Sequence, residues 1–128
     1  MKYYFSKIIT ASFEEARQLI EEKLKTFGFG IVSEIDIHEK FREKLGVDFR
    51  KYKILGACSP KHAHTAISHE EHIGLMLPCN LVLQEKENDQ VEVSVIDPVA
   101  SMQAVENPSL GTIANEIRNN LILFIKSL

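Results

Sequence analysis

The chain has 128 residues, 45% of them apolar and 26% charged, and its fifteen Lys and Arg against eighteen Asp and Glu leave a formal net charge of −3. This length is typical of one domain that buries its own core, so we expect a single domain over residues 1–128. The basic residues are scattered among glutamates. This pattern does not favour a nucleic-acid-binding protein, which needs a clustered positive surface.

The sequence also argues against a membrane protein. Its longest uninterrupted apolar run, Leu121 to Ile125, is five residues, whereas a membrane-spanning helix needs about 20. The N-terminal segment lacks the apolar centre and small-residue cleavage site of a signal peptide. The only two cysteines, Cys58 and Cys79, are too sparse for a disulfide scaffold. We therefore expect a cytoplasmic protein with reduced thiols.

The first two elements are a strand and a helix. Lys2 to Thr10, rich in Tyr, Phe and Ile, predicts a strand. Ser12 followed by Glu15 is a capping-box pattern that predicts the start of a helix. Gly28 suits the left-handed position after such a helix. The apolar stripe of the helix is Phe13, Ala16, Ile20, Leu24 and Phe27.

Residues 29–37 alternate between apolar and polar positions and predict a strand with one buried face. Residues 38–45 are charged and helix-favouring, with Gly46 closing a short surface helix. The apolar positions of the strand that share one parity are Phe29, Ile31, Ile35 and Ile37.

The middle of the chain returns to strand character at residues 52–58. Pro60 then opens a short helix that extends to about Ile67, because proline lacks the N–H that is unpaired at the first helical position. Residues 75–83 are the most apolar stretch and are interrupted by Pro78. A proline cannot donate to a sheet, so Pro78 implies a sheet edge, a bulge or the start of a strand.

Residues 87–90 are polar and predict a hairpin turn, after which Val91, Val93 and Val95 alternate with polar residues as in a half-buried strand. Asp97-Pro98 ends that strand with a turn, and Asp97 is suited to cap a helix that follows. Asn107-Pro108 is a suitable start for the last helix. The apolar stripe of this helix is Leu110, Ala114, Ile117, Leu121, Phe124 and Leu128.

The order of elements predicts an α+β fold with two layers. Several consecutive strands are joined by short connections, which favours antiparallel pairing over a parallel sheet with a helix between successive strands. We expect a mostly antiparallel sheet with the two main helices packed on one face, plus short surface helices.

The end of the last helix is apolar on more than one side. Ile122, Leu123 and Ile125 occupy positions outside the main stripe, and a helix of this kind is buried on more than one side. The second side indicates either a homodimer or coverage by loops of the same chain.

Several motifs resemble those of the domain-of-unknown-function 302 family. They are the segments 54–60 (Ile-Leu-Gly-Ala-Cys-Ser-Pro) and 73–80 (Ile-Gly-Leu-Met-Leu-Pro-Cys-Asn), with support from residues 12–16, 44–47 and 96–98. The resemblance covers essentially the whole chain. It implies a small α+β domain with layered sheet and helices that associates as a dimer. It implies no particular activity and brings no catalytic residues.

The two cysteines are the first candidates for chemistry. Each cysteine lies at the end of a strand segment and close to a proline. Pro78 directly precedes Cys79, and Pro60 follows Cys58 after one intervening residue. The two segments could therefore converge. One interpretation is a thiol enzyme or a redox or metal sensor, with Cys79 as the nucleophile and Cys58 as its partner. The alternative is that both are small core residues, which is the usual role of a free cysteine.

Four of the five histidines, His62, His64, His69 and His72, fall within eleven residues. They are candidate ligands for an adventitious metal ion. Their spacing does not match a zinc module such as His-Glu-x-x-His. Scattered surface histidines are therefore the favoured interpretation.

The sequence does not identify an activity, and it leaves open whether the protein is an enzyme. The favoured hypothesis is a dimer that binds a small molecule in a pocket near the segments that interrupt the apolar strands, because positions that break local rules tend to be functional. Tyr3 and Tyr4 face opposite sides of the first strand, so we expect one in the core and the other in a groove. A third alternative is an interaction module that uses the C-terminal helix. The pocket residues expected from this hypothesis are Cys58, Pro78, Cys79, Asn80 and Asp97.

Overall fold

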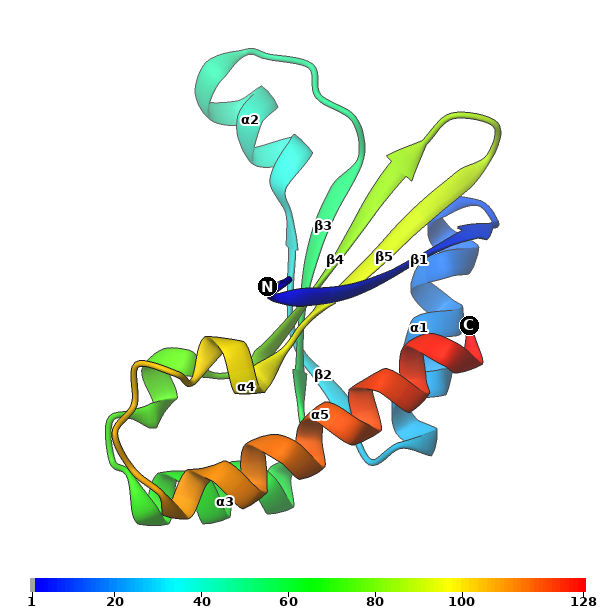
Figure 1. The fold of residues 1–128 in the computed structure, drawn as a ribbon. Helices are drawn as coiled ribbons and strands as arrows, with labels where there is room; N and C mark the ends of the chain where they lie inside the picture. The colour runs from blue at the N-terminus through cyan, green and yellow to red at the C-terminus, as the bar shows by residue number, and fades with distance from the viewer. Residues whose placement is uncertain (1) are drawn as a thin grey trace.

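Five strands form one antiparallel sheet. The computed structural model describes residues 2–128. The strands lie in the order β1-β5-β4-β3-β2, and every neighbouring pair is antiparallel, as the sequence predicts. Figure 1 shows β1 curving across one end of the sheet, beside β5. The bounds are β1 Tyr4–Thr10, β2 Gly30–Asp36, β3 Tyr52–Cys58, β4 Cys79–Lys86 and β5 Gln90–Ile96.

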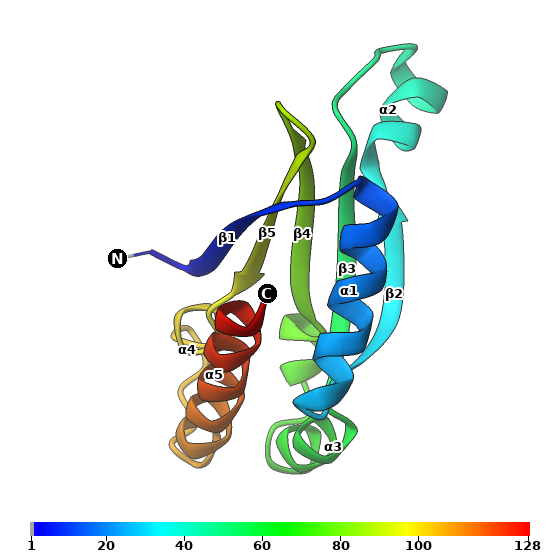
Figure 2. The ribbon, with the colours of Figure 1, turned by 90° about the vertical axis from the view of Figure 1, so that its right-hand side faces the viewer.

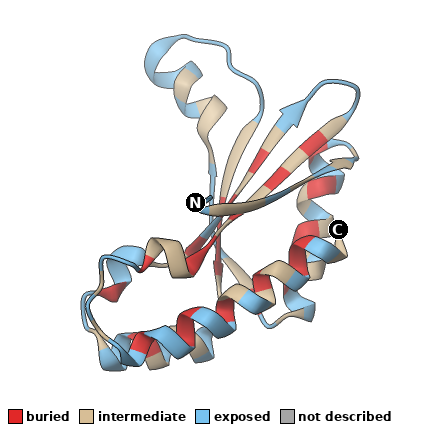
Figure 3. Ribbon diagram, viewed as in Figure 1, coloured by how far each residue is buried: buried red, intermediate tan, exposed pale blue. Residues whose placement is uncertain are grey.

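Two long helices, α1 (Phe13–Thr26) and α5 (Ser109–Ser127), cover one face of the sheet. In Figure 2, α1 lies in front of β2 and β3, and α5 extends below β1 and β5. The stripes predicted for both helices supply buried residues, and the alternating valines of β5 are buried as well (Figure 3). The opposite face of the sheet, formed by the other parity of each strand, has no long helix over it. We call it the open face.

The predicted helix and turn signals are confirmed. The Ser12 hydroxyl accepts a hydrogen bond from the Glu15 N–H at 3.1 Å at the start of α1. Gly28 and Gly46 have φ values of +84° and +64°, the left-handed conformation that glycine adopts without strain. The β4–β5 hairpin turns through Asn88 and Asp89, with φ values of 59° and 54°. Two such residues in succession match the twist of the strands they connect.

The prediction of a regular strand over residues 29–37 is wrong in its middle. The pairing of β2 with β3 shifts between Ile31 and Ser33, which marks a bulge at this sheet edge. Ile31 therefore pairs with core-facing Ala57, whereas Ile35 pairs with Ile54 and is 43% exposed. One extra residue in a strand reverses the side on which all later side chains lie. The alternation of apolar and polar residues in the sequence does not reveal this bulge.

The apolar stretch 75–83 is not one strand. Residues Ile73–Met76 form a short 3-10 helix, η1, and β4 begins at Cys79, directly after a cis Leu77–Pro78 peptide bond. Leu75 does not share the buried face of Leu81 and Leu83 and is 86% exposed. Of the three interpretations of Pro78, the start of a strand is the one confirmed.

The short helices are α2 (Ile37–Leu45), α3 (Pro60–His69) and α4 (Pro98–Ser101). The predictions of α2 and α3 are confirmed, with α3 extending two residues beyond Ile67. The helix α5 starts at Ser109. The side-chain amide oxygen of Asn107 accepts a hydrogen bond from the Ser109 N–H at 3.1 Å. Asn107 thus satisfies a donor at the start of α5, in line with its predicted capping role.

Most of the apolar side chains at the end of α5 are buried by other parts of the same chain. Ile125 is 8% exposed and belongs to the core, and Ile122 is half-buried beside β1. Leu123, at 51% exposed, is the one that points outward. Coverage by the same chain therefore explains two of the three positions. Across residues 2–128, none of the helices has the length and apolar character needed to cross a bilayer.

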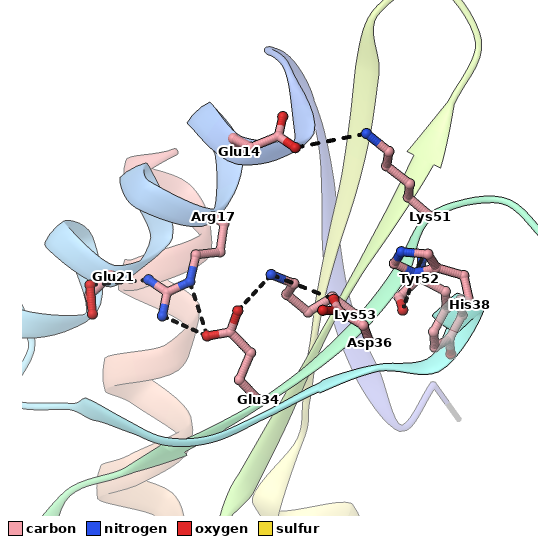
Figure 4. A network of polar contacts seen from close by, with 9 residues as sticks. All are labelled: Glu14, Arg17, Glu21, Glu34, Asp36, His38, Lys51, Tyr52 and Lys53. Carbon is pink, nitrogen blue, oxygen red and sulfur yellow. Dashed lines mark hydrogen bonds and ion pairs between the residues drawn. The ribbon is translucent and has the colours of Figure 1, made fainter. Parts of the chain in front are cut away.

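A polar network joins α1 to the β2–β3 edge (Figure 4). Glu34 accepts from Arg17 Nη2 at 2.7 Å and from Lys53 Nζ at 2.6 Å, and Arg17 also pairs with Glu21 at 3.0 Å. The bulge in β2 places Glu34 on the side of the sheet that faces α1. Hydrogen bonds from Arg17 and then Lys53 lower the pKa of Glu34 from 4.5 to about 2.

Glu34 should therefore make the stability of the protein depend on pH in the acid range. Its contribution is present above pH 4.5 and is lost as the pH falls toward 2, because the unfolded chain takes up the proton first. The side chain is 35% exposed, so we expect about 1 kcal/mol at low salt. Urea denaturation at several pH values should show a weaker acid dependence in Glu34→Gln. Glu87→Gln, on the exposed hairpin, is the control, and parallel pH curves for wild type and Glu34→Gln would contradict the assignment.

Candidate functional site

The structure brings the two cysteines together. Ala57 pairs with Cys79 across β3 and β4, and Cys58 is the next residue of β3. Both cysteines and Pro78 line a cavity of about 20 Å³ between the end of the sheet and α3. A space of this size holds about one water molecule. The predicted convergence of the two segments is therefore observed, but the cavity is too small to enclose a whole organic ligand.

The environment of Cys79 disfavours it as the nucleophile. The residue is 5% exposed, and burial raises the pKa of its thiol to about 11, with a further contribution from the neighbouring Cys58. A thiol must lose its proton to react, so this setting opposes reactivity near neutral pH. Cys58 is half-buried and is the more accessible of the two.

We expect the two thiols to be alkylated at clearly different rates. Cys58 should react with iodoacetamide in the folded protein, whereas Cys79 should react only as the pH approaches about 11 or the chain unfolds. The variants Cys58→Ser and Cys79→Ser assign each rate to one thiol. Equal rates at pH 8 would show that Cys79 is not held in its protonated, buried state.

Asn80 lies on the other side of the sheet from Cys79. Consecutive residues of a strand point to opposite faces, and Cys79 is buried under the helices while Asn80 is exposed. Pro78 packs against Gly56, where an added Cβ atom would come within 2.5 Å of the proline ring. The expected set Cys58, Pro78, Cys79 and Asn80 is thus divided between the small cavity and the open face.

Asp97 has a structural role. The residue is 3% exposed, and its carboxylate accepts from the Val99 N–H at 3.0 Å and from Arg118 Nε at 3.2 Å. It caps α4 and ties the end of β5 to α5. It lines neither the cysteine cavity nor the open-face hollow described below. Of the two roles expected for Asp97, the helix cap is therefore confirmed, whereas its assignment to a ligand pocket is corrected.

The four histidines do not form a cluster. In the described part of the chain, no three His, Cys, Asp or Glu side chains come close enough to hold a metal ion. His64, His69 and His72 are exposed. His62 differs from them, because it lines the cysteine cavity and contacts Ser59 and Glu116. The structure does not support His62, His64, His69 and His72 as a shared metal site.

A hollow of about 310 Å³ lies on the open face. This volume is at the lower end of the range of small-molecule sites. The chain has three tyrosines, and all three line the hollow. Neither Tyr3, which is 64% exposed, nor Tyr4, which is half-buried, is a core residue, contrary to the prediction for one of them. The lining residues are Tyr3, Tyr4, Tyr52, Asn80, Val82, Gln84, Glu92, Ser94, Val95 and Ile96.

One side of the hollow is ordered by side-chain contacts. Gln84 Oε1 accepts from Arg50 Nη2 at 2.9 Å, and Gln84 Nε2 donates to Glu92 at 3.4 Å. Lys86 Nζ lies 3.8 Å from the Glu92 carboxylate. These contacts fix the orientation of the Gln84 amide and partly neutralise Glu92.

Other polar groups at the hollow are free. The three tyrosine hydroxyls, the Asn80 amide and the Ser94 hydroxyl make no hydrogen bond to another residue within 2–128. Together with the aromatic rings they offer both stacking surfaces and hydrogen-bonding groups. The hollow is therefore equipped to bind a ring-containing molecule that carries polar substituents.

Sequence reasoning identified Asn80 and one groove tyrosine but missed Tyr52, Gln84, Glu92 and Ser94. Three of them form a row across the sheet, since Tyr52 pairs with Gln84 and Gln84 with Glu92. Ser94 lies in the neighbouring row, opposite Val82. In the sequence, these residues occupy the polar positions of the alternating strands. Such positions usually form a solvated surface, so they did not indicate a site. Only the pairing register shows that they meet.

A family model described as "Domain of unknown function DUF302" matches residues 5–128. The chain belongs to the DUF302 family. A crystal structure of an uncharacterised conserved DUF302 protein from Bacillus stearothermophilus is similar, with a TM-score of 0.89 and 27% identity over 98% of each chain. No curated protein matches the chain.

These comparisons confirm the α+β fold that the resemblance implies. The family match spans both cysteine segments and the open-face strands. The DUF302 description names no activity, so functional conclusions rest on the geometry of the hollow and of the cavity.

Proposed function

We propose that this DUF302 protein binds a small, ring-containing polar molecule in the open-face hollow. The observation that carries the proposal is that all three tyrosines of the chain converge on one ligand-sized hollow with their hydroxyls unpaired. Tyrosine provides a large contact area at low cost in conformational entropy. This moves the expected binding site from the cysteines to the other face of β4, with Asn80 as the shared residue.

The charge around the hollow favours a neutral or weakly cationic ligand. Glu92 is the only carboxylate of the lining, and it is only partly neutralised by Lys86 at 3.8 Å. Arg50 is engaged by Gln84 and stacks at 4.4 Å over Phe49. A strongly anionic ligand has no free cation among the lining residues, whereas Asn80 and Ser94 can pair with donors and acceptors of a ring substituent.

The intrinsic fluorescence of the protein tests this proposal directly. The chain contains no Trp, and its three tyrosines all lie at the hollow, so tyrosine emission reports on this site alone. Titration with a set of small phenols, nicotinamide, adenine and cytosine should identify at least one compound that changes the emission saturably. Asn80→Ala should weaken its binding roughly three- to tenfold, the effect of one hydrogen bond.

The matched control is Asn119→Ala, because Asn119 is an exposed asparagine on α5 outside the hollow. The control should bind as the wild type does. No saturable change with any compound, or equal effects of the two substitutions, would contradict the proposal. Sedimentation of the same samples shows whether the chain is a monomer or a dimer with and without the compound.

A cytoplasmic homodimer remains part of the proposal. Leu123 on α5 and the exposed side chains of the open face, such as Ile8 and Ile35, are apolar surface that a second copy would cover. A dimer through the open face would close the hollow and bury its ligand. The alternative of an interaction module through α5 now depends mainly on Leu123, since Ile125 is buried.

A further inference from the structure

A serine, a histidine and a glutamate form a hydrogen-bonded chain beside the cysteine cavity. Ser59 Oγ lies 2.8 Å from His62 Nδ1, and His62 Nε2 lies 3.0 Å from Glu116 Oε2. Ser59 is at the turn between β3 and α3, His62 is in the first turn of α3, and Glu116 comes from α5. Groups 54 residues apart in the sequence thus meet through the packing of α3 against α5.

The hydroxyl of Ser59 does not have the usual role of its position. A serine directly before a helix normally accepts from a backbone N–H of the first turn, but Ser59 makes no such bond. Instead its hydroxyl lies within hydrogen-bond distance of His62 Nδ1. Because the Glu116 carboxylate can only accept, His62 Nε2 carries the proton of the neutral imidazole, and Nδ1 then accepts from the Ser59 hydroxyl. With the two hydrogen bonds in these directions, the imidazole can take a proton from the hydroxyl while the carboxylate stabilises the resulting cation.

The surroundings of Ser59 supply two further requirements of acyl chemistry. The N–H groups of Lys61 and His62 lie in the first turn of α3, where helical partners are lacking, and neither makes a hydrogen bond within residues 2–128. Such donors can stabilise the oxyanion of a tetrahedral intermediate. The cavity of about 20 Å³ beside Ser59 is lined mainly by apolar side chains, and it accommodates a methyl group but not a longer chain.

We propose that Ser59, His62 and Glu116 hydrolyse esters or thioesters of acetyl-sized carboxylic acids. Ser59 Oγ attacks the carbonyl carbon while its proton moves to His62 Nδ1. The bond to the leaving alcohol or thiol then breaks, and the leaving group takes that proton. Water attacks the acylated Ser59, again giving its proton to His62, and the departing Ser59 oxygen recovers it. Glu116, which is 59% exposed, positions the imidazole and does not touch the substrate.

The test is hydrolysis of p-nitrophenyl acetate by the full chain, with mass spectrometry of the acetylated peptide. Acetylation should appear on Ser59. Ser59→Ala and His62→Gln should each slow nitrophenol release roughly 100-fold or more. p-Nitrophenyl butyrate should react far more slowly than the acetate, because the cavity excludes the longer chain. The matched control is His64→Gln, an exposed histidine of the same helix, which should behave as the wild type.

The Glu116→Gln variant tests whether Glu116 acts on the His62 imidazole through its charge or only by packing against it. The titratable groups around His62 are Glu116 on α5 and the thiols of Cys58 and Cys79 at the cavity. Removing the carboxylate destabilises the imidazolium, so the acid limb of the rate profile should move to lower pH. Acetylation of Cys58 or of lysines instead of Ser59 would overturn the proposal, as would wild-type rates in folded Ser59→Ala. An unchanged pH profile in Glu116→Gln would overturn the role of Glu116.

Discussion

Replacing Gly56 by alanine is expected to destabilise the protein by about 2 kcal/mol, the cost typical of overpacking. Gly56 is fully buried in the middle of β3. An added Cβ atom would lie 2.5 Å from Cγ of Pro78 and would also collide with the Ser33 hydroxyl. The serine can rotate away, but the proline ring is rigid, so the start of β4 must move. Urea denaturation measures this loss.

Gly111→Ala is the matched control for Gly56→Ala. A Cβ atom at Gly111 meets nothing within 4 Å, and the residue lies in the first turn of α5. Alanine there should be neutral or stabilise the helix by up to about 1 kcal/mol. If Gly56→Ala were as stable as the wild type, Pro78 would not be packed on β3 as described. The clash would also shift Asn80, which pairs with Gly56, so ligand binding at the hollow should weaken as well.

Asp97→Ala should also cost about 2 kcal/mol of unfolding free energy. The substitution removes the cap of α4, which is worth about 1 kcal/mol. It also removes the hydrogen bond from Arg118, which contributes a similar amount because Arg118 is 37% exposed. Thermal or urea denaturation should show this loss.

Asp97→Asn distinguishes the two contributions. Its amide oxygen can still accept from the Val99 N–H, so we expect roughly half of the loss, about 1 kcal/mol. Asp48→Ala is the control, because Asp48 is 94% exposed and should change stability by less than about 0.5 kcal/mol. An Asp97→Ala variant as stable as this control would show that the buried carboxylate is not needed for the junction of β5, α4 and α5.

Local signals predicted most of the fold. Ser12, Gly28 and Gly46 marked helix ends correctly, and the alternation of Val91, Val93 and Val95 matched their burial. The failures occurred where one residue changed the register of a segment. The bulge near Val32 and the turn before Pro78 are such places, and hydrophobic alternation does not distinguish them from a continuous strand.

The candidate sites were predicted less well than the fold. Cys58 and Cys79 were correctly expected to converge, but burial of Cys79, which raises its pKa to about 11, follows from helices packed over it. For Asp97 the sequence suggested both a helix cap and a pocket residue, and only the cap is observed. His62 was grouped with neighbouring histidines because they are close in sequence. Its actual partner Glu116 is 54 positions away.

The sequence by itself determined the α+β fold class, the positions of both long helices and the faces that they bury, because capping, periodicity and turn conformation depend on neighbours within a few residues. The tertiary structure decided which polar side chains meet. Strand order and register gather the three tyrosines with Asn80 and Gln84, and the packing of α3 on α5 joins Ser59 and His62 to Glu116. Such contacts join residues far apart in the chain, and no local pattern specifies them.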